Sequence, residues 1–165
     1  MLGIASAALL LIGILALYLF LAGTPVDRPA FAGLLLILTG TTFFLPFIGI
    51  YAFTGPVLGR RYLGGDKTAV TIISESTSIT NPTALVFGGT AVFLLVLGAI
   101  LLGAAIWRSR TLPKLPGPLL AFGITLSADP LFYYQPIVWV AGGALVLLSG
   151  IWIASRVSRT TTDSL

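Results

Sequence analysis

The chain has 165 residues, of which 57% are hydrophobic and 8% are charged, and its formal net charge is +4. A soluble domain carries roughly 25% charged residues, so this composition is typical of a membrane protein instead. Cysteine and histidine are both absent, which excludes disulfides, thiolate metal sites and the commonest general base. We therefore expect no catalytic residue, no metal site and no cofactor.

The positive charge does not predict nucleic-acid binding. The basic residues form no long cluster with interleaved aromatic residues, which is the pattern of a nucleic-acid surface. In a membrane protein, basic residues in loops fix the orientation of the chain and contact anionic headgroups. The expected partner is therefore the lipid bilayer.

Five apolar stretches contain no Asp, Glu, Lys, Arg or His, and they cover residues 2–22, 31–58, 84–107, 115–128 and 131–155. A charge near the centre of a bilayer costs at least ~2.5–3.5 kcal/mol, so this segregation is what a lipid solvent selects. The sequence predicts a single all-α integral membrane domain, a bundle of about five transmembrane helices. Residues 59–83 form an outer loop and residues 156–165 form a tail.

No basic residue precedes Arg28, so the first stretch has none at or before its start. A secretory signal needs a positively charged start and a short apolar core, whereas about twenty apolar residues are long enough to span a bilayer. The pattern favours a retained span that begins outside. A cleaved signal peptide is the alternative.

The second stretch has Pro46 near its middle. Proline removes a backbone hydrogen bond, so we expect a kink there. Thr39, Thr41 and Thr42 lie one turn earlier, where their hydroxyls can satisfy freed carbonyls. A bent structural helix is the preferred interpretation, and a gating hinge is the alternative.

The outer loop contains a run of β-branched residues at positions 68–73. Such residues are enriched in strands. We therefore expect a short extended, β-prone segment in this loop.

Small residues recur along one face of the third stretch and of the last stretch. Close approach of backbones at small residues is how membrane helices associate. We expect both faces to be contacts between spans, and homodimer formation through one of them is the alternative. The residues are Ala84, Gly88, Ala91, Gly98 and Ala105 in the third stretch, and Gly142, Gly143, Ser149 and Gly150 in the last.

The fourth stretch, residues 115–128, is short enough to be either a thin span or a re-entrant segment. If it spans, the basic residues divide six to three between the two faces, as Arg28, Arg108, Arg110, Lys114, Arg156 and Arg159 against Arg60, Arg61 and Lys67. The positive-inside rule then favours five spans, with the N-terminus outside and the C-terminus in the cytoplasm. Four spans plus a re-entrant segment are the alternative.

The most polar group expected on the outer face consists of Asp129, Tyr133, Tyr134 and Gln135. Asp129 precedes a proline and is typical of a turn, and the tyrosines are typical of an interfacial aromatic belt. A small outward binding pocket is the alternative interpretation.

A basic segment, Arg-Ser-Arg-Thr-Leu-Pro, follows the apolar stretch that ends at Trp107, and Leu-Pro-Gly and a further apolar run come next. This arrangement, over about residues 91–156, resembles a pattern common in uncharacterised bacterial multi-span membrane proteins. The resemblance implies a multi-pass protein of a prokaryotic cytoplasmic membrane, and it carries over no active-site residue.

Uncharged spans with small-residue faces favour a non-catalytic role. We expect an accessory or structural subunit of a membrane complex, which contacts other membrane subunits or a second copy of itself. The alternative is a small transporter or channel for a neutral or lipid-like solute. Transport sites usually leave polar residues or broken helices at membrane depth, and inverted repeats are not evident.

Overall fold

The computed structural model describes residues 2–68, 71, 75, 81–128 and 136–162, and within them every regular element is a helix. The prediction of an all-α protein is therefore confirmed for the described residues. The elements are α1 (Leu2–Leu21), α2 (Asp27–Gly49), the π-helix η1 (Ile50–Thr54), α3 (Gly55–Leu63), α5 (Pro82–Arg108), α6 (Pro116–Ala128) and α7 (Pro136–Thr162).

Three helices in this part of the chain are long and apolar enough to cross a membrane. They are the continuous helix Asp27–Leu63, the helix Pro82–Arg108, and the segment Ile137–Val157 of α7. The helix α6 has only 13 residues, which at the helical rise gives a length of about 20 Å. It is therefore shorter than the ~30 Å hydrocarbon core of a typical bilayer.

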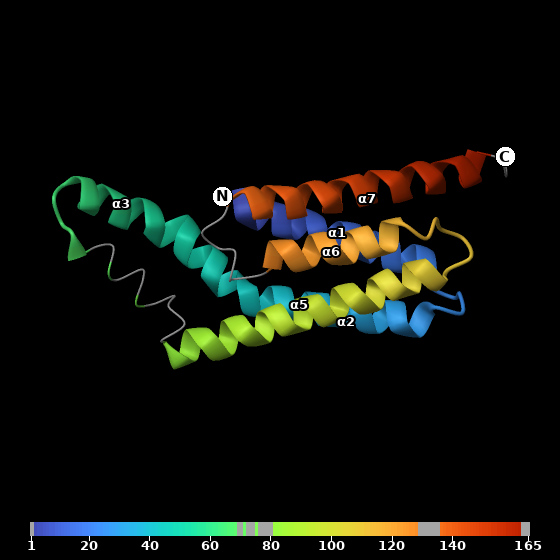
Figure 1. Ribbon diagram of the computed structural model, residues 1–165, viewed down its shortest axis with the longest axis horizontal. Coiled ribbons are helices and arrows are strands. Elements are labelled where there is room, and N and C mark those ends of the chain that lie inside the picture. The colour runs from blue at the N-terminus through green and yellow to red at the C-terminus, as the bar shows by residue number, and fades with distance from the viewer. Residues whose placement is uncertain (1, 69–70, 72–74, 76–80, 129–135, 163–165) are drawn as a thin grey trace.

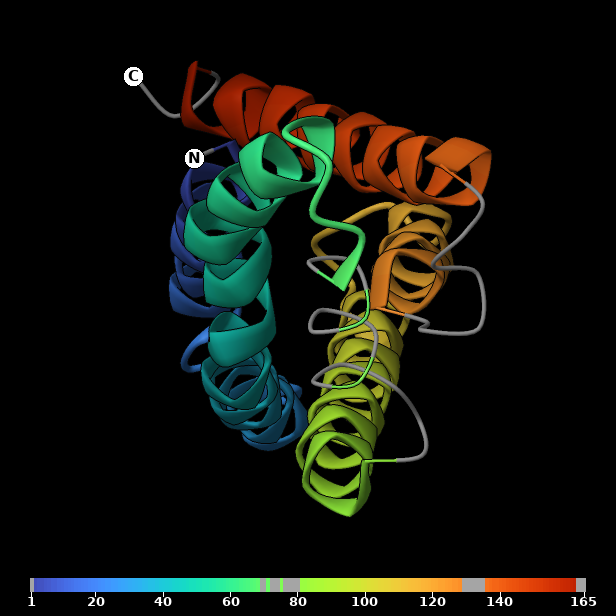
Figure 2. The same ribbon diagram turned by 90° about the vertical axis from the view of Figure 1, so that its left-hand side faces the viewer.

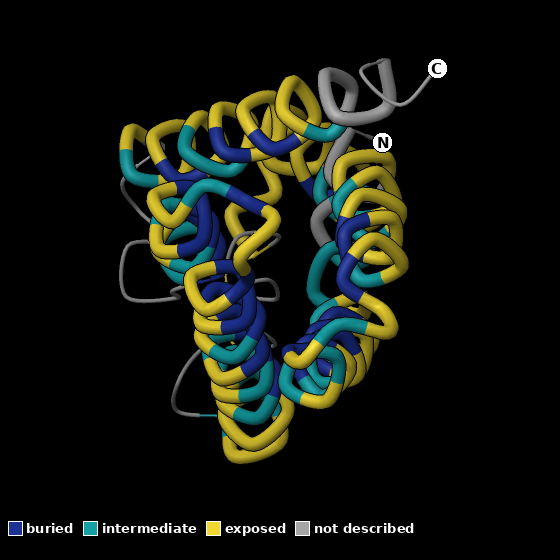
Figure 3. Tube along the Cα trace, turned by 90° about the vertical axis from the view of Figure 1, so that its right-hand side faces the viewer, coloured by how far each residue is buried: buried dark blue, intermediate teal, exposed yellow. Residues whose placement is uncertain are grey.

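Helices α1, α2, α5, α6 and α7 pack in a curved row in this order. Helix α5 lies between α2 and α6, α7 packs on α6, and α1 packs on α2 (Figures 1 and 2). Buried residues lie on the sides of the helices that face each other, and exposed residues cover the outside (Figure 3). The buried core is almost entirely apolar and draws on α1, α2, α5, α6 and α7.

Local signals in the sequence fix both ends of α5. The side chain of Asn81 caps the start by accepting hydrogen bonds from the backbone N–H groups of Thr83 (3.0 Å) and Ala84 (3.3 Å). Pro82 follows in the first turn, where its missing N–H costs no intrahelical bond. At the other end, the Ser109 hydroxyl donates to the carbonyl of Ile106 (2.8 Å).

The second helix is longer than the predicted stretch of residues 31–58, because it begins at Asp27 and continues to Leu63. After Pro46 the hydrogen bonding changes to the π pattern, in which the N–H of Gly55 donates to the carbonyl of Ile50. The chain then changes direction between α2 and α3 (Figure 1). A bend is therefore present, and its π-helical part begins one turn after the proline.

The hydroxyls of the threonines before Pro46 do not bond to the carbonyl that the proline leaves without a partner. The hydroxyls of Thr39 and Thr42 donate to the carbonyls of Leu35 and Leu38, both at 2.9 Å. The carbonyl freed by Pro46 is that of the residue four positions earlier. These hydroxyls are therefore satisfied within the helix before the bend, by a type of bond that often bends a helix slightly.

The predicted outer loop is partly helical. Residues 59–63 belong to α3, and Thr68 and Thr71 are helical rather than extended. Asp66 accepts hydrogen bonds from the backbone N–H (3.1 Å) and the hydroxyl (2.5 Å) of Thr68, and the Thr71 hydroxyl donates to the carbonyl of Thr68 (2.7 Å). These local bonds outweigh the strand preference of β-branched side chains.

Candidate functional site

Helices α2 and α5 meet at glycines that leave no room for a side chain. A Cβ atom on Gly98 would lie 2.8 Å from Cγ1 of Ile37 and 2.9 Å from the carbonyl oxygen of Gly33. A Cβ on Gly33 would lie 3.0 Å from the carbonyl oxygen of Gly98. The two backbones therefore touch directly at this pair.

The same contact continues one and two turns along the two helices. A Cβ on Gly40 would lie 2.9 Å from Cγ of Leu95 and 3.0 Å from the carbonyl oxygen of Ala91. Gly33 and Gly40 are seven residues apart, which places them on one face of α2. Small residues on both helices thus set the close approach of α2 and α5.

The small-residue face predicted on the third span lies at this contact for most of its length. Ala91, Gly98 and Ala105 are buried, and Ala84 and Gly88 are half-buried. A Cβ on Gly88 would meet only the ring of Phe47, at 3.5 Å. The approach of α2 and α5 is therefore closest around Gly98 and looser toward the start of α5.

Helices α5 and α6 are also joined by a pair of glycines. A Cβ on Gly117 would lie 2.5 Å from the carbonyl oxygen of Gly103, and a Cβ on Gly103 would lie 2.9 Å from the carbonyl oxygen of Gly117. The side chain of Ile106 packs beside this pair, since its Cβ would lie 3.1 Å from a Cβ added to Gly117. No substitution that adds a Cβ fits here without moving a backbone.

Helices α6 and α7 meet at Gly123 and Gly142. A Cβ on Gly142 would lie 2.5 Å from Oγ of Ser127 and 2.9 Å from the carbonyl oxygen of Gly123. Gly143 and Gly150 instead face open space, with no atom within 4 Å of an added Cβ. Of the four residues predicted on this face, Gly142 lies at the contact with α6 and Ser149 is fully buried, whereas Gly143 and Gly150 are turned away from it, because adjacent helical positions point about 100° apart.

Sequence reasoning missed the glycines that α2 and α6 contribute to these contacts. The missed residues are Gly33 and Gly40 in α2, and Gly117 and Gly123 in α6. The seven-residue spacing of Gly33 and Gly40 was an available signal. The glycines of α6 lie in a helix of only 13 residues that begins with two prolines in its first three positions, so they form no long regular pattern.

Hydroxyl groups inside the helices are bound to the backbone of their own helix. Ser127 donates to the carbonyl of Gly123 (2.9 Å), and the fully buried Ser149 donates to the carbonyls of Leu145 (2.8 Å) and Val146 (2.9 Å). Such bonds satisfy a hydroxyl that has no water nearby. Both hydroxyls therefore donate to backbone carbonyls of their own helices.

Acidic groups do not gather into a site in the part of the chain that the structure describes, where no cluster of three or more potential metal ligands occurs. Oδ1 of Asp27 is buried without a hydrogen-bond partner. Asp27 lies in the first turn of α2, where the helix dipole favours a negative charge. The predicted outer-face group, Asp129, Tyr133, Tyr134 and Gln135, lies outside the described residues.

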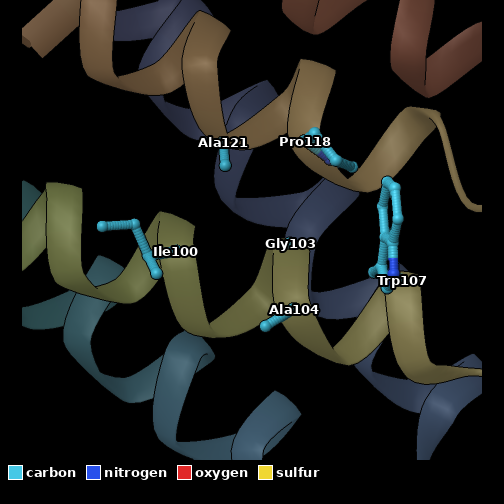
Figure 4. Close-up of a pocket in the computed structure, with 6 residues that line it drawn as sticks. All are labelled: Ile100, Gly103, Ala104, Trp107, Pro118 and Ala121. Atoms are coloured by element: carbon cyan, nitrogen blue, oxygen red, sulfur yellow. The ribbon is translucent and has the colours of Figure 1, made fainter.

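An apolar groove of about 250 Å³ runs between the outer sides of α5 and α6. Ile100, Gly103, Ala104 and Trp107 of α5 and Pro118 and Ala121 of α6 line it (Figure 4). Ile100 and Trp107 mark its two ends along α5, and both are about half-exposed. The groove therefore opens to the surroundings of the bundle.

The basic residues are distributed unequally between the two ends of the molecule. Helix α5 ends where α2 and α6 begin (Figure 1), so Arg28, Arg108, Arg110 and Lys114 share this end. Arg60 and Arg61 lie on α3 at the opposite end. The side chains of all six residues are exposed.

Comparison with known proteins gives no further guide to function. No family model matches the chain, and no curated protein and no solved structure matches it either.

Proposed function

We propose that the chain is a non-catalytic, multi-pass integral membrane protein that serves as an accessory or structural subunit of a membrane complex. The observation that carries this proposal is the outward face of α7. In the apolar segment of α7, 11% of the residues are buried, against 28% in each of the other two membrane-length segments. The helix thus has most of its surface free for contacts beyond this bundle.

The free face of α7 has the features of a helix-binding surface. Gly143 and Gly150 are exposed and seven residues apart, so they lie on one side of the helix. Leu147 lies between them and is 63% exposed. Small residues that flank a large apolar one allow a second membrane helix to approach closely. The partner is another membrane subunit or a second copy of this chain.

Extraction in mild detergent followed by native mass spectrometry tests this proposal. The native protein should retain a partner, and Gly143→Leu/Gly150→Leu should lose it. The matched control is Gly13→Leu/Gly89→Leu, because both of these glycines also face open space on exposed helix surfaces. A native chain that is monomeric and free of other proteins would contradict the proposal.

The five-span topology belongs to the same proposal. Helix α6 is short for a span, but it is packed between α5 and α7. Backbone at membrane depth is tolerated where protein rather than lipid surrounds it, so a helix of this length can form part of a crossing. The larger basic end then faces the cytoplasm, with the N-terminus outside. The resemblance to bacterial multi-span proteins favours a prokaryotic cytoplasmic membrane.

A small transporter or channel for a neutral or lipid-like solute is the second candidate. The observation that favours it is the π-helix η1, since π-helical segments are frequent at functional sites. It lies between Pro46 and Pro56, two positions that cannot donate a backbone hydrogen bond. Solute flux in proteoliposomes that contain only this protein would favour transport over the subunit role.

A further inference from the structure

We infer that the groove between α5 and α6 binds an anionic phospholipid, with one acyl chain in the groove and the phosphate on the basic residues at its end. The inference does not depend on the subunit role. It rests on the shape of the groove, the charges beside it and the anchoring of those charges.

The groove has the dimensions and lining of an acyl-chain site. It extends from Ile100 to Trp107, a distance of about 10 Å along the helix axis. One leaflet of the hydrocarbon core is about 15 Å thick, so the groove holds the upper part of a chain, next to the headgroup. Every lining residue is apolar or glycine, apart from the single indole N–H of Trp107, which suits the interface.

Positive charge is placed where the headgroup of such a lipid would lie. Arg108 directly follows Trp107, and Arg110 and Lys114 belong to the short connection to α6. All three side chains are exposed. Basic pockets between membrane helices at the cytoplasmic side bind anionic headgroups, and each Lys or Arg near the surface strengthens this attraction. A zwitterionic headgroup gains much less from these residues, because it carries no net charge.

The connection that holds these charges is fixed to the bundle. Ser109 is 7% exposed and Leu112 is 6% exposed, so two of its residues are anchored in the core. The Ser109 backbone N–H also donates to the carbonyls of Ala105 (2.9 Å) and Ile106 (3.1 Å). Anchoring reduces the entropy lost when a ligand is bound, and it distinguishes this site from a mobile basic loop.

Quenching of Trp107 by brominated lipids tests the inference. The chain has three tryptophans, so Trp139→Phe/Trp152→Phe leaves Trp107 as the only one. This variant is reconstituted in phosphatidylcholine vesicles with increasing fractions of brominated phosphatidylglycerol or brominated phosphatidylcholine. We expect half-maximal quenching at an about tenfold lower fraction of the anionic lipid, which corresponds to about 1.4 kcal/mol.

Two variants in the same background separate the charges from the groove. Arg108→Gln/Arg110→Gln/Lys114→Gln should abolish the preference, whereas Arg60→Gln/Arg61→Gln, at the other end of the molecule, should retain it. Ala104→Leu should fill the groove and reduce the preference at least threefold. Its control is Ala8→Leu on the exposed side of α1, which should leave the preference unchanged.

Three results would overturn the inference. The first is equal quenching by the two brominated lipids in the starting protein. The second is a preference that survives loss of the three basic residues. The third is a preference that Ala104→Leu leaves intact, because binding would then take place on the basic connection alone. Far-UV circular dichroism of each variant confirms that the helices are intact.

Discussion

The substitution Gly98→Ala tests whether backbone contact holds α2 and α5 together. The new methyl group would lie 2.8 Å from Cγ1 of Ile37, 2.9 Å from the carbonyl oxygen of Gly33 and 3.0 Å from the backbone nitrogen of Ile37. Two of these three atoms belong to the backbone of α2, so a side-chain rotation cannot relieve the contact. The helices must move apart, which loses packing along their whole shared length.

The expected magnitude follows from two opposing terms. Alanine favours a helix over glycine by up to about 1 kcal/mol, whereas overpacking of a tight interior costs about 1–3 kcal/mol. The control Gly89→Ala is on the same helix but has no atom within 4 Å of its added Cβ, so it isolates the first term. Gly98→Ala should therefore be less stable than Gly89→Ala by about 1–3 kcal/mol.

Thermal unfolding in mild detergent, followed by tryptophan fluorescence, measures this difference. Gly33→Ala should also destabilise, because its Cβ would lie 2.9 Å from the backbone nitrogen of Leu102. The double variant should cost less than the sum of the two single variants, since the first substitution already separates the helices. Equal stability of Gly98→Ala and Gly89→Ala would refute the reasoning.

The remaining predictions concern α7, the topology and proton coupling. Gly142→Ala should lower stability by about 1–3 kcal/mol relative to Gly143→Ala in the same unfolding assay, and equal effects would place the α6 contact elsewhere. A reporter fused after Leu165 should be active only in the cytoplasm, and activity outside would reverse the topology. Proteoliposomes with an imposed pH gradient should show the same background proton flux for the native protein and Asp129→Asn. Flux that the native protein shows and Asp129→Asn loses would establish a proton path.

The sequence predicts the all-helical class because the pattern of apolar stretches does not depend on how the helices pack. Five apolar stretches separated by charged residues require backbone hydrogen bonds within each stretch, and a helix supplies them. The contact at Gly98 was predictable for a similar reason, since glycine at regular spacing on a membrane helix has few other uses. The spacing of Gly33 and Gly40 predicts a contact face on α2 in the same way, but the helix that this face contacts is known only from the structure.

The register of α7 could not be predicted from its own residues. Gly142 and Gly143 are chemically identical, and Ser149 and Gly150 are both small, so either pair could have formed the contact. The choice depends on Gly123 and Ser127 of α6, whose positions the sequence does not reveal. The predicted second stretch ends at residue 58, before Arg60 and Arg61, because these two residues mark the edge of the apolar region, whereas α3 continues to Leu63. A helix can continue into water, where its hydrogen bonds persist.

In the proposed topology five segments cross the membrane, and the short α6 decides whether the number is five or four. The chain has no cysteine, so a single cysteine at Lys114 or at Asp129, just beyond either end of α6, can be labelled alone. A membrane-impermeant maleimide added to intact cells should label Asp129→Cys directly, and Lys114→Cys only after the membrane is opened. Labelling of both positions from the same side would show that α6 re-enters rather than crosses, and it would contradict the five-span account.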